Sequence, residues 1–159
     1  MTTDIFERLR EDHDEFRTLI DILEKTEGDS EGRLEIFPKL AWMVRTHAHA
    51  EERVLYAELM RYTETRELAG HSTKEHHEAE EIIEDLEGKS LSDSGWLTRF
   101  KTLAEELRHH MDEEEKEVFP VAGRVLSADR KRAMVDEFDR ARRTEAEKAR
   151  EETRLQPLS

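Results

Sequence analysis

Apolar residues recur at steps of three and four along four long segments, and this spacing limits the fold more than any other feature of the sequence. In residues 4–25 the apolar stripe consists of Phe6, Leu9, Phe16, Ile20 and Leu23. Similar stripes predict helices over about residues 34–61, 73–87 and 95–121. Glycines mark the loops between these segments, and no segment alternates with period two for long enough to predict a strand.

Long amphipathic helices joined by short loops predict an all-α fold, an antiparallel up-down four-helix bundle. A further helix is predicted to begin near Ser127, a good N-cap residue, and to pack across one end or side of the bundle. Beyond about Asp139 an Arg/Glu run has no apolar face, so we expect a solvated helix that frays toward Ser159. The chain thus divides into a bundle at residues 1–126 and a C-terminal charged helix and tail at residues 127–159.

Charge and composition exclude several classes of function. Asp and Glu total 40 against 26 Lys and Arg, and the resulting net charge of −14 argues against a nucleic acid or a membrane surface as partner. The chain has no cysteine, which excludes disulfides, thiolate zinc sites, iron–sulfur clusters and cysteine nucleophiles. There is no signal-like start and no apolar run of the ~20 residues needed to cross a bilayer, so we expect a cytoplasmic protein.

Some positions of the apolar stripes are occupied by polar residues. Half of the eight histidines continue a stripe and are expected to point inward: His13, His47, His76 and His110. The others are not expected to do so: His49, His71, His77 and His109. Glu51 and Glu114 are also inward, and each follows an inward histidine by four residues, so imidazole and carboxylate can reach one point. Carboxylates without a partner are costly to bury, and no Lys or Arg lies at the matching levels, so we predict a metal ion between the helices.

An internal repeat relates these residues. A shift of 63 places His13 on His76, His47 on His110 and Glu51 on Glu114, and it also superimposes most of the apolar positions. The two helical hairpins therefore look like copies, which would bring two equivalent ligand sets to the bundle centre. A buried polar network without metal is the alternative.

The ligand types narrow the choice of metal. Mixed imidazole and carboxylate ligands suit iron or manganese, with zinc possible. Two bridging carboxylates and four histidines would fill about eight of the ~12 positions of an octahedral pair. Oxo, hydroxo, water or an exogenous small ligand would take the rest, so such a site is open.

The pattern H…HxxxE…H…HxxxE, with EEEKEVFP at residues 113–120, resembles the hemerythrin-like HHE cation-binding domain. The resemblance covers about residues 4–121 and implies a non-haem di-iron centre, oxo- or hydroxo-bridged, on the six inward residues. Ferritin-like bundles differ, because they carry Glu-x-x-His at i, i+3.

One departure from the oxygen-carrying members of that family bears on function. They have a further histidine on the third helix, where this chain has Ser72 and Glu80 on either side of His76. Their fourth helix ends in HxxxxD rather than HxxxE. The chain therefore resembles the bacterial six-ligand type rather than the members that carry oxygen reversibly. Tyr56, which stands where the second copy has Phe119, is an additional candidate ligand, with a core aromatic as the alternative.

Three classes of function stay open at this point. The first is a di-iron binding protein that binds or reacts with dioxygen, peroxide or nitric oxide, for sensing, iron handling or oxidative-stress defence. The second is a di-iron enzyme of peroxide breakdown, which would need proton donors and a substrate channel. The third, less favoured, is a metal-free helical interaction protein. Whether the chain is an enzyme, and its oligomeric state, are not determined by the sequence.

Overall fold

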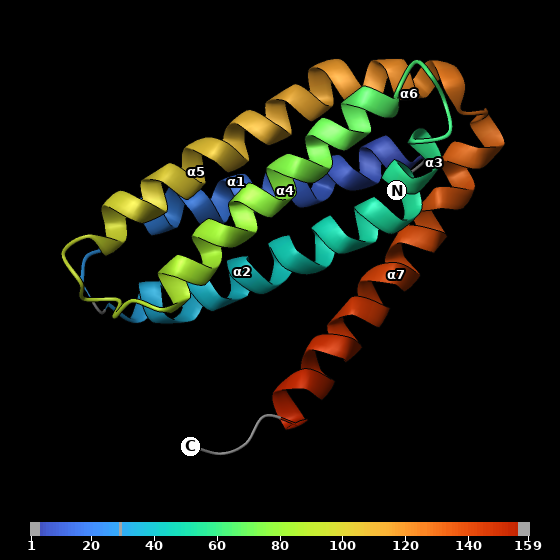
Figure 1. Ribbon diagram of the computed structural model, residues 1–159. Helices are drawn as coiled ribbons and strands as arrows, with labels where there is room; N and C mark the ends of the chain where they lie inside the picture. The colour runs from blue at the N-terminus through green and yellow to red at the C-terminus, as the bar shows by residue number, and fades with distance from the viewer. Residues whose placement is uncertain (1–3, 29, 156–159) are drawn as a thin grey trace.

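The computed structural model describes residues 4–28 and 30–155, with side chains to residue 152. Long antiparallel helices form the bundle (Figure 1), with the bounds α1 Ile5–Glu24, α2 Glu31–Glu51, α4 Arg66–Glu87 and α5 Trp96–Glu113. No strand occurs among the described residues. The predicted all-α four-helix bundle with an additional C-terminal helix is confirmed.

Side-chain caps fix where the first two helices begin. Asp4 accepts a hydrogen bond from the backbone N–H of Glu7 at 3.0 Å, and Ser30 accepts one from Arg33 at 3.2 Å. Each satisfies a donor that the first turn of a helix leaves free. Between these helices Gly28 adopts a φ of 52°, a conformation that favours glycine.

Two π-helical turns directly follow α2 and α5, the second and fourth helices of the bundle. The segments are η1 Glu52–Tyr56, continued by α3 Ala57–Leu59, and η2 Glu114–Val118, continued by α6 Phe119–Val125. In each, a backbone N–H bonds to the carbonyl five residues earlier, from Ala57 to Glu52 and from Phe119 to Glu114. Such turns are frequent at functional sites, and here both lie at equivalent places in the repeat.

The third bundle helix begins earlier than the sequence suggested. α4 starts at Arg66 rather than near Thr73, and Gly70 lies inside it rather than in a loop. A glycine inside a helix costs about 1 kcal/mol relative to alanine. Packing offsets this cost, because Ala69 is completely buried and Ser72 is 2% exposed.

The C-terminal helix α7, Ala128–Leu155, runs back beside α1 and α2 (Figure 1). Ser127 caps it through the N–H of Arg130, as the sequence predicted. The expectation of a solvated helix beyond Asp139 is wrong for the described residues, because Ala141 and Ala146 are buried. Small alanines provide this contact, and in an Arg/Glu-rich run they do not stand out as an apolar face. Ser159 lies outside the described residues.

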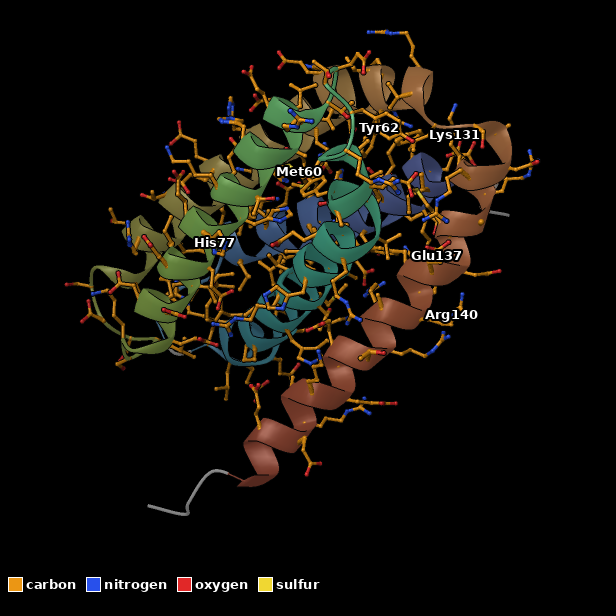
Figure 2. All side chains as sticks on the ribbon, turned by 45° about the vertical axis from the view of Figure 1, so that its right-hand side comes forward. Met60, Tyr62, His77, Lys131, Glu137 and Arg140 are labelled. Atoms are coloured by element: carbon orange, nitrogen blue, oxygen red, sulfur yellow. The ribbon has the colours of Figure 1, made fainter. Side chains whose placement is uncertain are left out.

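Charged side chains cover the outside of the bundle (Figure 2), and the exposed Arg140 projects from the side of α7 turned away from the bundle. In the described part of the chain, no helix combines the length and the apolar character that a membrane span requires.

Two apolar clusters fill the inside, one toward each end of the bundle. One contains Phe37, Trp96 and Phe100, and the other contains Phe6 and Phe119. The four inward histidines lie in the layer between these two clusters.

Candidate metal centre

The six inward residues of the sequence analysis meet in this middle layer. They come from four bundle helices and the start of a π-turn: His13 on α1, His47 and Glu51 on α2, His76 on α4, His110 on α5 and Glu114 on η2. Both glutamates are almost completely buried, at 0% and 1% exposure. The four histidines expected to lie outside are exposed: His49, His71, His77 and His109.

The side chains form two groups that share a carboxylate. His13, His47 and Glu51 offer ligand atoms that all lie within 4.8 Å of one another, and so do His76, His110 and Glu51. We call the α1–α2 side the first half and the α4–α5 side the second half. Oε1 of Glu51 lies 3.7 Å from Nε2 of His47 in the first half and 3.3 Å from Nε2 of His76 in the second half.

Glu114 makes the equivalent connection from the other side. Its Oε1 lies 3.1 Å from Nε2 of His13, and its Oε2 lies 3.8 Å from Nε2 of His110. Each glutamate therefore lies between one histidine of each half. This is the arrangement in which a carboxylate can bridge two metal ions.

The environment of the two carboxylate oxygens of Glu51 indicates whether a cation fits between the two halves. Both are buried, and neither accepts a hydrogen bond from any residue that the structure describes. Burial, with the neighbouring Glu114 carboxylate, raises the pKa of Glu51 well above its usual range. A cation between the two halves would remove this penalty. The imidazole and carboxylate donors therefore fit a transition-metal ion.

Each of the four inward histidines also contacts a second carboxylate through its Nδ1 atom. The Nδ1 contacts are His13 to Glu115 at 2.7 Å, His47 to Asp12 at 2.7 Å, His76 to Glu52 at 3.0 Å and His110 to Glu75 at 2.9 Å. Such a contact fixes the ring orientation and makes Nδ1 the protonated nitrogen, which leaves the lone pair of Nε2 for a metal. All four Nε2 atoms lie toward the centre.

Sequence reasoning missed these outer carboxylates, although a signal for them was present. The shift of 63 residues that relates the inward ligands also places Asp12 on Glu75 and Glu52 on Glu115. Each is the immediate chain neighbour of an inward residue. The repeat therefore includes the groups that orient the ligands as well as the ligands.

The pKa values of two inward histidines and of one outer carboxylate reflect this packing. Burial alone would lower the pKa of His13, but its contacts with Glu114 and Glu115 raise it to about 10. Burial lowers the pKa of His47 to about 4, although Asp12 opposes the change. Burial alone would raise the pKa of Glu75, and the contact with His110 lowers it instead.

Tyr56 distinguishes the second half from the first. Its hydroxyl donates a hydrogen bond to Oε2 of Glu114, and its ring stacks on His76 with centroids 5.5 Å apart. Burial and the nearby carboxylates raise the pKa of Tyr56 well above its usual range. At the equivalent place Phe119 stacks on His13 at 6.2 Å, and it has no hydroxyl.

The first half is closed by α7. The ring of Phe138 meets the ring of His47 edge-on at 5.4 Å. Asp12, which holds His47, also accepts hydrogen bonds from Arg8 at 2.9 Å and from Arg142 of α7 at 3.2 Å. This side of the centre is therefore covered by an additional helix.

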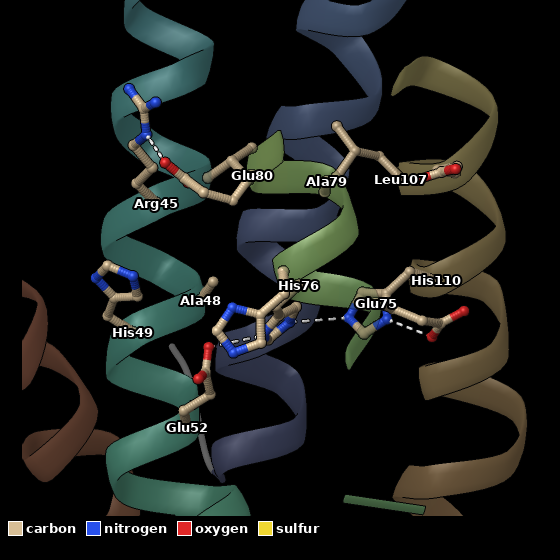
Figure 3. Close-up of a pocket in the computed structure, with 13 residues that line it drawn as sticks. Arg45, Ala48, His49, Glu52, Glu75, His76, Ala79, Glu80, Leu107 and His110 are labelled. Atoms are coloured by element: carbon tan, nitrogen blue, oxygen red, sulfur yellow. Dashed lines mark hydrogen bonds and ion pairs between the residues drawn. The ribbon is translucent and has the colours of Figure 1, made fainter. Parts of the chain in front are cut away.

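The second half opens onto a small cavity between α2, α4 and α5 (Figure 3). Its volume is about 50 Å³, and it reaches His76 and His110. Ala48 and Ala79 belong to its apolar wall, while Arg45 lies at its edge with an ion pair to Glu80 at 2.7 Å. Among the described residues the two halves therefore differ, because α7 covers the first and a cavity adjoins the second.

Comparison with known proteins agrees with the helical fold. A solved structure of a hemerythrin HHE cation-binding domain-containing protein from Mycobacterium kansasii is similar over 98% of this chain and 94% of that chain, with a TM-score of 0.83 and 20% identity. A hemerythrin-like protein of Schizosaccharomyces pombe is 26% identical over 107 residues, which are 66% of this chain and 53% of that protein. The chain thus spans about half the length of that curated relative. The family model for the hemerythrin HHE cation-binding domain matches residues 4–122. The chain belongs to the hemerythrin HHE cation-binding domain family.

Proposed function

We propose that this chain binds two non-haem iron ions, one in each half, and that the pair binds or reacts with a small ligand such as dioxygen, peroxide or nitric oxide. The six inward residues are the proposed ligands: His13, His47, Glu51, His76, His110 and Glu114. The observation that carries the proposal is that Glu51 belongs to both groups while its two buried oxygens accept no hydrogen bond from the described residues. Manganese and zinc are the alternatives to iron.

The residues of the chain have separate tasks in this proposal. Iron, when bound, supplies open coordination positions and a change of oxidation state for a small ligand. The outer carboxylates hold the imidazoles in place, and the apolar clusters exclude bulk water. A cavity of about 50 Å³ favours an occupant of only a few atoms, since one water molecule in the liquid takes up about 30 Å³.

Peroxide breakdown is a second candidate function, and Tyr56 favours it. Its hydroxyl bonds to Glu114 and its ring stacks on His76, so it lies in the half that the cavity reaches. Cleavage of a peroxide bond needs a proton donor close to the reacting atoms. A buried phenol with a raised pKa stays protonated at neutral pH and holds such a proton.

Replacing Glu51 with glutamine tests the shared ligand. We expect purified wild-type protein to contain two irons per chain and Glu51→Gln to lose most of both, because the same carboxylate serves both halves. Glu35→Gln, an exposed change on the same helix, is the matched control and should retain the wild-type iron. Elemental analysis gives the stoichiometry, and circular dichroism shows that each variant is folded.

The outcomes separate the parts of the proposal. Two irons retained in a folded Glu51→Gln variant would contradict the bridging role. His76→Ala should lose iron mainly from the second half, which distinguishes a single-ion ligand from a shared one. Peroxide or nitric oxide should then change the near-ultraviolet and visible spectrum of the iron-loaded wild-type protein. An unchanged spectrum with both would contradict the proposal that the iron pair binds or reacts with a small ligand.

A further inference from the structure

A second cluster of metal-binding side chains lies outside the bundle centre, on the face formed by α4 and α5. His71 and Glu75 are four residues apart on α4, and His109 and Glu113 are four residues apart on α5. The two helices are antiparallel neighbours, so His71 lies opposite Glu113 and Glu75 lies opposite His109. None of the four belongs to the six proposed ligands of the centre.

The spacing of their donor atoms suits a single ion. Nε2 of His71 lies 3.5 Å from Oε2 of Glu75 and 3.5 Å from Oε1 of Glu113. Nε2 of His109 lies 3.8 Å from Oε2 of Glu75 and 3.1 Å from Oε2 of Glu113. Ligands of a tetrahedral zinc ion, each about 2.0–2.2 Å from the metal, are about 3.4 Å apart. These four imidazole–carboxylate distances are close to this separation, and His71, Glu75 and Glu113 offer ligand atoms that all lie within 4.8 Å of one another.

Glu113 gives an independent indication of a missing partner. Its Oε2 is buried and accepts no hydrogen bond from the described residues, although Nε2 of His109 is 3.1 Å away. Within the described part of the chain, every ion-pair partner of Glu75 and Glu113 is a histidine. A neutral imidazole leaves these carboxylates uncompensated, and a divalent cation would compensate them.

We propose that His71, Glu75, His109 and Glu113 form a separate site for one divalent cation of the zinc type. Two imidazoles and two carboxylates, without thiolate, match zinc and the other late first-row divalent ions. The side chains of His71 and His109 are 53% and 68% exposed, so the ion can enter and leave from solvent. This distinguishes the outer site from the buried centre.

Glu75 connects the outer site to the central one. Its Oε2 faces the outer cluster, while its Oε1 contacts Nδ1 of His110 at 2.9 Å (Figure 3). A cation on Oε2 draws charge from the carboxylate that orients His110, because outer carboxylates tune the histidines they hold. Occupancy of the outer site therefore alters the electronic environment of the second half.

Zinc chloride added to the full-length protein, with its purified metal content in place, tests the site. After removal of free zinc, elemental analysis counts zinc and the original metal separately. We expect about one additional zinc per chain with the original metal retained, because the outer donors match a single tetrahedral ion. His109→Ala should weaken zinc binding at least about tenfold, since loss of even an outer partner of a ligand costs that much.

Controls make each outcome decisive. His77→Ala removes another exposed α4 histidine that lies outside the cluster, and it should bind zinc as wild type does. Glu113→Gln keeps the side-chain shape and should weaken zinc binding as His109→Ala does. No retained zinc, equal retention by all variants, or zinc gained only as the original metal is lost would each overturn the outer site. The zinc count does not depend on which metal the centre holds, so this test and that of the proposed function fail separately.

Discussion

Replacing Phe138 with alanine tests whether α7 is a structural part of the metal-binding unit. The side chain is 1% exposed, its ring meets His47 at 5.4 Å, and the guanidinium of Arg8 lies 5.3 Å from its centroid. Truncating a buried phenylalanine costs about 3–5 kcal/mol, including the cavity left behind. For a chain of this size each kcal/mol lowers the melting temperature by about 2–4 °C, so we expect a decrease of about 10 °C.

Thermal unfolding of the metal-free protein, followed by circular dichroism, measures this loss without the contribution of bound metal. Arg143→Ala is the matched control, because this exposed residue lies on the same helix and should change stability by less than about 0.5 kcal/mol. If the alanine variant does not fold, Phe138→Leu should give a smaller decrease in the same direction. A decrease in Phe138→Ala no larger than in the control would refute the packing of α7 on His47. In loaded protein, Phe138→Ala should also release metal to a chelator faster than wild type.

Two further changes test the orientation of the ligands and the role of Tyr56. Asp12→Asn should lower metal affinity about 10–100-fold in chelator competition, because His47 loses the carboxylate that fixes its tautomer; unchanged affinity would mean that packing alone orients the ring. If Tyr56 is a ligand, Tyr56→Phe should remove a visible charge-transfer band from the ferric protein. An identical spectrum would leave Tyr56 only the hydrogen bond to Glu114 that the structure shows.

The spacing of residues along single helices was enough to predict the bundle and the group of inward residues. Apolar positions at steps of three and four define one face of each helix, and any polar residue on that face must enter the interior. His47 and Glu51 were identified in this way, as were His110 and Glu114, and the shift of 63 residues then related the two pairs. Their convergence follows from antiparallel packing of two similar hairpins. Their role as ligands is still a prediction.

Tertiary structure decided which of the many acidic residues hold the histidines. Forty carboxylates are distributed along the chain, and helical periodicity does not say which of them meets a ring on another helix. The contact between Asp12 and His47 joins residues 35 positions apart, and that between His13 and Glu115 joins residues 102 apart. Only the packed helices determine these pairs.

The sequence by itself determined that the chain makes two similar helical hairpins with histidines and glutamates on their inner faces, because periodicity is a property of each helix alone. Tertiary structure decided that the two halves of the centre are unequal. Beyond Asp139 the buried contacts of α7 are made by small alanines, and the sequence alone does not show that a residue such as Ala146 is buried, because its burial depends on the surface packed against it. Phe138 of this docked helix closes one half at His47, whereas the other half, which α7 does not line, opens toward His76. The repeat in the sequence is nearly symmetric, and the packing of the last helix breaks that symmetry.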